Sequence, residues 1–249
     1  MLYFLQKQSF GGYGMKTKKQ AAEIVNTLEA AYPMAECFLD SEDAWQLLVA
    51  VRLSAQCTDL RVNATTPILF GKFPTIDALA DADPKDIEEI VKPCGLGKSK
   101  ARDINLCMKM LRDEFNYVVP DNMDDLLKLP GVGRKSANLI IGDVYGKPAI
   151  VADTHCIRLS NRLGFLKDTT DPYKVELELK RVVEPAKQND FCHRLVEHGR
   201  AVCTARKAMC EKCVLAPYCD YKKAEDKKAA KEAAKAAKKA DRKTAGSNV

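Results

Sequence analysis

Apolar residues recur at intervals of three and four along most of this 249-residue chain, which places them on one face of an α-helix. The stretches with this pattern are 17–31, 42–55, 59–70, 76–82, 85–93, 99–116, 123–128, 134–145, 154–164, 174–183 and 189–202. Only PAIVAD, residues 148–153, reads as extended, and it is too short to make a sheet. The pattern therefore predicts an all-α fold whose helices are joined by short loops.

Start and stop signals accompany several of these patterns. Ser41 is predicted to cap the helix that contains WQLLVAV, because a serine oxygen accepts hydrogen bonds from the first turn of a helix. Asp83-Pro84 is predicted to open the helix DIEEIV, since proline suits the first helical position. Gly95 is predicted to end the segment that precedes it, because glycine readily adopts the left-handed conformation found after helices.

The stretch LPGVGRKSANLI, residues 129–140, follows a short helical pattern (MDDLLKL) and runs into a longer one. This order predicts a helix-hairpin-helix, in which the glycines allow a sharp turn and a close approach to a ligand. The unpartnered N–H groups at the start of the second helix suit a phosphate oxygen. We therefore predict that Gly131, Val132, Gly133 and Arg134 hold a nucleic-acid backbone without reading its sequence.

Lys135 falls in the first turn of that second helix, where the positive end of the helix dipole disfavours a cation. Two interpretations of this residue are open from the local sequence. It is either an ordinary phosphate contact or a nucleophile, because the neutral form of an amine is the reactive one.

Asp153 precedes the helical pattern HCIRLSNRL and so has the position of an N-cap residue. A carboxylate at the start of a helix can also face a cleft while it remains ionised. Lys135 and Asp153 therefore stand at the starts of successive helices, and we expect them to converge on one pocket.

Four of the ten cysteines fall within a short segment, with the spacing C-x6-C-x2-C-x5-C. They are Cys203, Cys210, Cys213 and Cys219. Four thiolates in one compact loop can hold either Zn²⁺ or a [4Fe–4S] cluster, and the ligand chemistry alone does not choose between them. The other six cysteines are scattered singly through helical patterns, so a disulfide framework is not predicted, and a reducing intracellular compartment fits both groups.

The formal net charge of +6 comes from the end of the chain. Residues 222–249 carry ten Lys or Arg and four Asp or Glu, which leaves thirty of each in residues 1–221. The Lys/Ala-rich tail has too few large apolar residues to bury a core, and it is interpreted either as a solvated tail or as a phosphate-binding arm.

Residues 1–14 are predicted to be a disordered extension. No segment of the sequence is apolar for long enough to span a membrane.

Together these motifs resemble the endonuclease III family, the helix-hairpin-helix DNA glycosylases of base excision repair that carry an iron–sulfur cluster. The resemblance extends from about residue 17 to Tyr221. It rests on LSAQCTD (53–59), GLGKSKA (95–101), LPGVGRKSAN (129–138), VADTHCIRLSNR (151–162) and HGRAVCTARKAMCEKCVLAPYC (198–219).

The resemblance implies roles for single residues. Lys135 matches the catalytic lysine of the family, and Asp153 matches its essential aspartate. Gln56 and Leu96 match residues that wedge into the duplex where the damaged base leaves.

The resemblance also implies that the four cysteines hold a [4Fe–4S] cluster, which decides the open choice of metal in favour of iron. Arg206 and Lys207, between the first two ligands, match a basic loop that touches DNA phosphates. The implied architecture has two helical domains. They are a six-helix barrel at 37–147 and a cluster domain that joins 15–36 to 148–221, followed by the tail at 222–249.

The activity that the resemblance implies is a bifunctional DNA glycosylase and AP lyase, acting as a monomer on double-stranded DNA with oxidised or ring-saturated pyrimidines. The expected location is the cytoplasm, at the nucleoid. A glycosylase of the same fold for mismatched thymine or UV dimers remains an alternative, and so does a non-catalytic DNA-binding module. An adenine glycosylase is disfavoured because VAVRLSAQ, residues 49–56, lacks a carboxylate. A metal-dependent nuclease is disfavoured because no acidic cluster has two-metal spacing.

Overall fold

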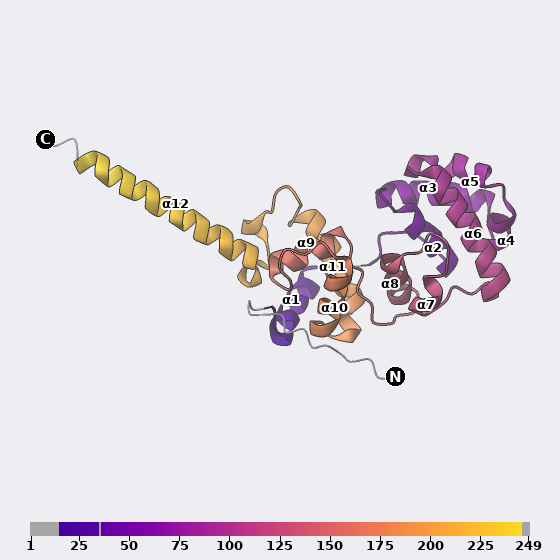
Figure 1. The fold of residues 1–249 in the computed structure, drawn as a ribbon, viewed down its shortest axis with the longest axis horizontal. Helices are drawn as coiled ribbons and strands as arrows, with labels where there is room; N and C mark the ends of the chain where they lie inside the picture. The colour runs from indigo at the N-terminus through magenta and orange to yellow at the C-terminus, as the bar shows by residue number, and fades with distance from the viewer. Residues whose placement is uncertain (1–14, 35, 246–249) are drawn as a thin grey trace, which may run out of the picture.

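Helices are the only extended regular elements in residues 15–34 and 36–245, which are the residues that the computed structural model describes (Figure 1). The predicted all-α fold is therefore confirmed, whereas the prediction for residues 1–14 lies outside the described residues. The α-helices are α1 (Lys18–Ala31), α2 (Ala44–Leu53), α3 (Asp59–Lys72), α4 (Ile76–Asp81), α5 (Pro84–Val91), α6 (Gly97–Phe115), α7 (Met123–Leu126), α8 (Arg134–Asp143), α9 (Thr154–Leu163), α10 (Pro172–Val182), α11 (Gln188–Ala201) and α12 (Asp220–Ala245). Single 3-10 turns occupy Lys92–Cys94, Pro185–Lys187, Cys210–Lys212 and Ala216–Tyr218.

Two of the three helix-boundary signals act as the sequence predicts. Asp83 caps α5 by accepting a hydrogen bond from the backbone N–H of Lys85, and Gly95 ends the preceding 3-10 turn with a φ of +74°. The prediction for Ser41 is wrong, because α2 begins after Asp43, whose side chain makes no capping hydrogen bond. Gln46 instead accepts a hydrogen bond from the N–H of Glu42, just ahead of the helix.

The helices lie in two groups (Figure 1). In the first group α6 packs against α4 and α5, and α2 packs against α8. The buried face of α6 shows why this helix lies inside the group: Ala101, Ile104, Met108 and Leu111 follow the predicted helical spacing and are almost fully shielded from solvent.

The second group joins α1 to helices from the C-terminal half of the chain, because α1 packs against α11 and α11 packs against α9. Ile24 and Leu28 of α1 are fully buried there. The rings of Phe165 and Phe191 meet edge to face, with their centroids 6.2 Å apart. Segments from both ends of the sequence thus share one core.

The two groups meet along α8. Near its end, Asp143 Oδ1 lies 2.7 Å from both His193 Nε2 and Asn189 Nδ2 of α11. Gly142 lies so close to Asn189 that a β-carbon would sit 2.1 Å from its Oδ1 atom. The start of the same helix carries Lys135, so this contact fixes the helix that presents the candidate lysine.

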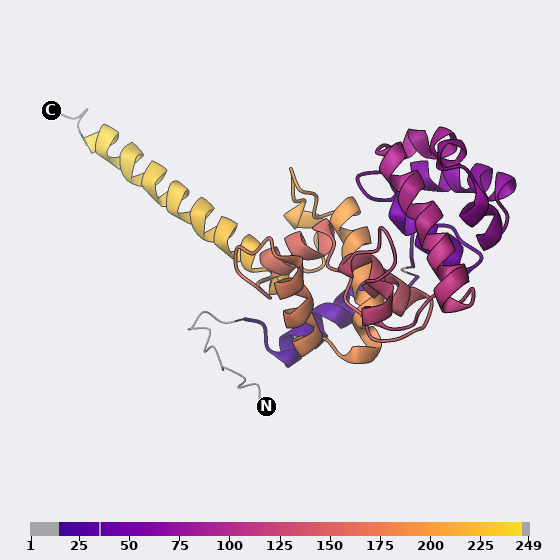
Figure 2. The same cartoon turned by 45° about the vertical axis from the view of Figure 1, so that its right-hand side comes forward.

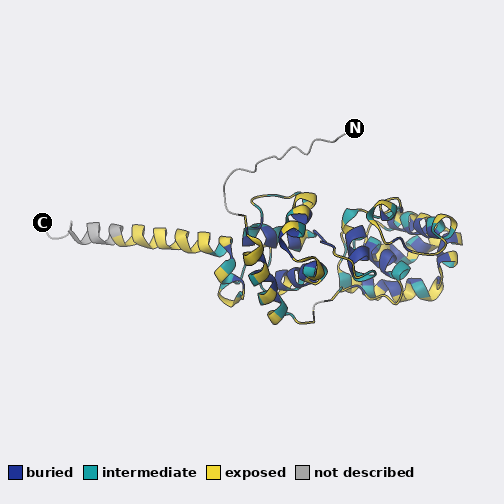
Figure 3. Cartoon of the chain, turned by 90° about the horizontal axis from the view of Figure 1, so that it is seen from below, coloured by how far each residue is buried: buried dark blue, intermediate teal, exposed yellow. Residues whose placement is uncertain are grey.

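The tail forms the 26-residue helix α12, which projects from the second group away from the first (Figures 1 and 2). From residue 223 to residue 237 its side chains are exposed all round, in agreement with the prediction that it buries no core (Figure 3). None of the helices in the described part of the chain combines the length and the hydropathy that crossing a membrane requires.

Candidate functional site

A cleft of about 840 Å³ contains the residues in which the sequence predicts chemistry. Its walls come from the loop between α2 and α3, from the first turns of α8 and α9, and from the start of α10. Lys135, Asp153 and Gln56 all line it. The structure therefore brings together three predicted site residues that are far apart in the sequence.

The turn between α7 and α8 has the predicted helix-hairpin-helix geometry, and Gly131 makes it possible. This residue has a φ of +79°, which side chains other than hydrogen adopt only at a cost. A β-carbon here would also lie 2.7 Å from Arg52 Cδ and 2.9 Å from Asp103 Cβ. These two side chains pack against Gly131 and form an ion pair with each other, with Arg52 Nη2 at 2.7 Å from Asp103 Oδ2.

Gly133 serves the hairpin in a different way. It is the N-cap residue of α8 with a φ of −102°, which any residue adopts, and a β-carbon on it would meet no atom within 4 Å. No side chain caps α8 at this point. The N–H groups of its first turn therefore have no side-chain partner, which is the arrangement that suits a phosphate oxygen.

The Gly131→Ala variant is expected to lose about 2–4 kcal/mol of unfolding free energy, because a left-handed backbone and a steric overlap both act against it. Urea unfolding followed by circular dichroism measures this loss. Gly133→Ala is the matched control, and its loss should stay below about 1 kcal/mol, since neither penalty applies there. Equal losses in the two variants would contradict this account of the turn.

Lys135 is exposed at the start of α8, and its amine makes no hydrogen bond or ion pair with any residue that the structure describes. The neighbouring Arg134 differs from it. Its Nε and Nη2 atoms lie 2.6 and 2.8 Å from the carboxylate of Glu176, and its guanidinium stacks 4.6 Å from the centre of the Tyr173 ring. The amine of Lys135 is thus available to a ligand, whereas the guanidinium of Arg134 is already bound to Glu176 and Tyr173 of α10.

Glu176 was not expected at the site from the sequence, although it lies on the apolar face of α10 beside Val175 and Leu179. Its side chain is only 2% exposed and also accepts a hydrogen bond from Lys180 at 2.8 Å. Burial raises the pKa of Glu176, but the hydrogen bonds from Arg134 and Lys180 outweigh it and lower the net value. An acidic residue on an otherwise apolar helix face is the sequence signal that could have indicated this ion pair.

Asp153 combines the two roles that the sequence left open. Its Oδ1 atom caps α9 by accepting a hydrogen bond of 2.7 Å from the N–H of Cys156. The side chain is half-exposed in the cleft, and its Oδ2 atom has no hydrogen-bond donor among the described residues. One oxygen therefore fixes the carboxylate, and the residue lines the same cleft as Lys135.

His155, the second residue of α9, also lines the cleft. Burial lowers the pKa of this imidazole below its usual value, while the nearby Asp153 acts in the opposite direction. The Nη2 atom of Arg158 lies 3.1 Å from His155 Nδ1 and further fixes the ring. The fold thus places His155 beside Asp153 at the cleft, although no sequence pattern had singled it out.

Gln56 and Leu96 share a backbone feature that the sequence did not reveal. Both are non-glycine residues in the left-handed region, with φ values of +55° and +53°. Both side chains are exposed, and that of Leu96 lines a separate hollow with Lys98 and Arg102. Such strained residues persist only where the surrounding structure holds them, and they gather at functional sites.

The four predicted metal ligands line one small cavity beside α9 and the start of α12. The Nη1 atom of Arg162 donates to Cys203 Sγ at 3.1 Å, and His198 Nε2 lies 3.3 Å from Cys213 Sγ. In the described residues, no three Cys, His, Asp or Glu side chains are arranged to hold a single metal ion. Arg206 and Lys207 are exposed in the loop between Cys203 and Cys210 and lie outside the cleft lining.

Comparison with known proteins gives consistent matches. Residues 49–185 match the model of the HhH-GPD superfamily of base excision DNA repair proteins. An endonuclease III from Synechocystis sp. is 44% identical over 82% of this chain and 94% of its own length. A solved non-covalent endonuclease III–DNA complex superposes with a TM-score of 0.81 at 37% identity, covering 86% of this chain and all of the other. A trapped covalent endonuclease III–DNA intermediate superposes with a TM-score of 0.80 at 37% identity, over 85% of this chain and 99% of the other.

Proposed function

The chain belongs to the endonuclease III family within the HhH-GPD superfamily of base excision DNA repair proteins, and from this premise we propose that Lys135 and Asp153 make it a bifunctional DNA glycosylase and AP lyase. The observation that carries the proposal is the shared cleft. An amine without a protein partner and a carboxylate with a free oxygen line the same space, at the starts of two helices.

The cleft accepts a nucleotide turned out of the duplex, because a base cannot be attacked within the stack. Its volume of about 840 Å³ leaves room for a base and its sugar beside Lys135. Gln56 at the cleft edge and Leu96 in the neighbouring loop fill the gap that the nucleotide leaves. Meanwhile, the N–H groups of the first turn of α8, which follows the Gly131–Gly133 turn, hold a phosphate of the damaged strand.

Lys135 acts as the nucleophile in the first chemical step. Its nitrogen lone pair forms a bond to C1′ of the sugar as the glycosidic bond breaks. The departing base takes the electron pair of the glycosidic bond and a proton. Asp153 stabilises the positive charge that develops on the sugar and helps to transfer protons. Opening of the sugar ring then leaves C1′ double-bonded to the lysine nitrogen.

This Schiff base makes strand cleavage possible. The positive nitrogen acidifies the C2′ proton, and its removal sends an electron pair into a new C2′–C3′ double bond. The bond from C3′ to its phosphate oxygen breaks in the same β-elimination, and the phosphate leaves on the 3′ side. Water then hydrolyses the imine and releases the free amine of Lys135.

The four cysteines fit a [4Fe–4S] cluster, since all four line one cavity in a segment with little regular structure of its own. When bound, such a cluster would crosslink this segment and present Arg206 and Lys207 to DNA phosphates. The cluster domain would then comprise residues 15–36 and 148–221, and residues 37–147 would form the barrel domain. The reaction itself needs only the side chains of the cleft.

The substrates that we propose are double-stranded DNAs with oxidised or ring-saturated pyrimidines, or with abasic sites. One chain supplies the whole cleft, so we propose a monomer that acts at the nucleoid in the cytoplasm. A panel of defined duplexes with thymine glycol, mismatched thymine and a thymine dimer would identify the lesion class. Release of mismatched thymine or dimers, with thymine glycol left intact, would favour the alternative specificity.

The reaction is tested by incubating the purified protein with a duplex that contains one abasic site, in the presence of EDTA. We expect the strand to be cut 3′ to the site, leaving an unsaturated aldehyde on one fragment and a 5′ phosphate on the other. A non-catalytic binding module would bind the duplex and leave it uncut. Strict dependence on Mg²⁺, or a product with a free 3′ hydroxyl, would overturn the proposed mechanism.

A further inference from the structure

Lys100 is a fully buried lysine in the first turns of α6, with none of its side chain exposed to solvent. Its Nζ atom donates hydrogen bonds to the carbonyl oxygens of Leu53 at 2.7 Å and Cys94 at 2.8 Å. It forms no ion pair with an acidic side chain of the described residues. A buried ammonium without a counter-ion is costly, and an apolar side chain of similar length would avoid that cost.

The two carbonyl groups belong to the segments that lead into the two exposed loops. Leu53 is the last residue of α2, three positions before Gln56, and Cys94 ends a 3-10 turn two positions before Leu96. Carbonyl groups at the ends of helices lack partners within the helix. One ammonium therefore joins the last turns that precede both loops.

The loops need such support because of their backbone. Gln56 and Leu96 both adopt left-handed conformations, which residues other than glycine adopt only at an energetic cost. Neither loop ends in a side-chain cap, because Leu96, the N-cap residue of α6, and Thr58, the N-cap residue of α3, make no capping hydrogen bond. The contacts of Lys100 are thus a link that both loops share.

We propose that Lys100 is a positioning residue whose ammonium fixes the Gln56 loop and the Leu96 loop relative to each other, so that both side chains enter the duplex as one unit. The proposal rests on the function proposed above, because it assumes that these two side chains replace the extruded nucleotide. It assigns to Lys100 no contact with DNA or with the reacting sugar.

The first test replaces Lys100 with methionine, which keeps an unbranched apolar stem and removes the charge and both hydrogen bonds. Single-turnover release of thymine glycol should fall roughly ten- to a hundred-fold, as expected for two lost hydrogen bonds from a charged donor. Unstacking, reported by 2-aminopurine placed next to the lesion, should fall with it. Binding to an undamaged duplex should stay within about two-fold of the wild type, because the hairpin that holds the backbone is untouched.

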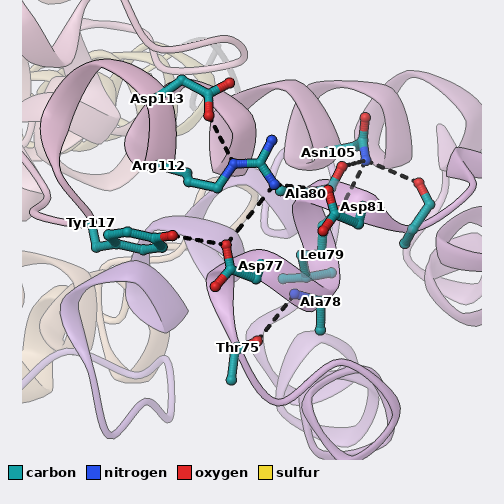
Figure 4. Close-up of polar contacts among 11 residues, drawn as sticks. Thr75, Asp77, Ala78, Leu79, Ala80, Asp81, Asn105, Arg112, Asp113 and Tyr117 are labelled. Atoms are coloured by element: carbon teal, nitrogen blue, oxygen red, sulfur yellow. Dashed lines mark hydrogen bonds and ion pairs between the residues drawn. The ribbon is translucent and has the colours of Figure 1, made fainter.

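Asn105→Ala is the matched control within the same helix. Asn105 is also buried, and its Nδ2 atom donates to the carbonyl groups of Leu79, Ala80 and Ala82 at the end of α4, which belong to neither loop (Figure 4). Its loss should lower the melting temperature while leaving lesion release and the 2-aminopurine signal near wild-type values. An equal fall in base release for Asn105→Ala and Lys100→Met would show a merely structural role and overturn the proposal.

A second measurement does not require the Lys100 variant to fold. In the wild-type background, the effects of Gln56→Ala and Leu96→Ala on base release should be coupled, so that the double variant loses less than the product of the single losses. Independent effects would overturn the proposal. A wild-type protein that neither releases bases nor cuts abasic sites would instead overturn the proposed function. Failure of the proposed function is thus distinguished from failure of the proposal for Lys100.

Discussion

Replacing Lys135 with alanine is expected to lower the rate of strand cleavage at an abasic site by at least about a thousand-fold, because no other residue that lines the cleft carries an amine. The fold should not change. Lys135 is exposed and its amine has no hydrogen bond or ion pair with a described residue, so the unfolding free energy should shift by less than about 0.5 kcal/mol. Rates measured under single-turnover conditions, together with urea unfolding, check both parts.

Lys135→Arg separates the two interpretations that the sequence left open for this residue. Arginine keeps the positive charge at the start of α8 and contacts phosphate at least as well as lysine. If Lys135 only gripped the backbone, the arginine variant would retain most of the activity. We expect it to bind abasic duplex with near wild-type affinity and to remain as inactive as the alanine variant.

Asp153→Asn is expected to lower the rate of base release by about a hundred-fold or more, since general acid–base and charge effects of a catalytic carboxylate have this size. Asparagine caps helices as well as aspartate does, so its side-chain oxygen can still accept the hydrogen bond from Cys156 that starts α9. The variant therefore removes the charge and preserves the cap. Single-turnover release of thymine glycol is the measurement.

Asp83→Asn is the control for that substitution. Asp83 caps α5 in the same way, through the N–H of Lys85, and does not line the cleft. Activity of this variant should equal that of the wild type. If Asp153→Asn retained full activity as well, Asp153 would be a structural cap alone and the proposed division of labour would be wrong.

The helices could be predicted from the sequence because most of them bury one apolar face, as α6 does at Ile104 and Met108. Their boundaries were harder to predict, since local capping competes with neighbouring interactions. Ser41 does not cap α2, and the short pattern at 123–128 shortens to α7, which ends at Leu126 before the hairpin turn. The family resemblance was confirmed by relatives that match most of the chain.

The site could be predicted only in part, because local sequence identifies single residues and not their tertiary partners. Lys135 and Asp153 each stand out at a helix start, and the structure brings both to one cleft. The ion pair of Arg134 with Glu176 joins residues 42 positions apart, so no local pattern could assign it. Lys100 looks like a surface lysine within GLGKSKA, and only the fold shows that it is buried.

The central claim is that the amine of Lys135 bonds covalently to the sugar, and reduction with sodium borohydride during the reaction tests it most directly. The reductant converts a Schiff base into a stable amine, which captures the protein on an abasic duplex. We predict a protein–DNA adduct whose digestion and mass spectrometry place the sugar remnant on Lys135, with no adduct for Lys135→Arg. An adduct of undiminished yield in that variant, or one mapped to another residue, would contradict the account.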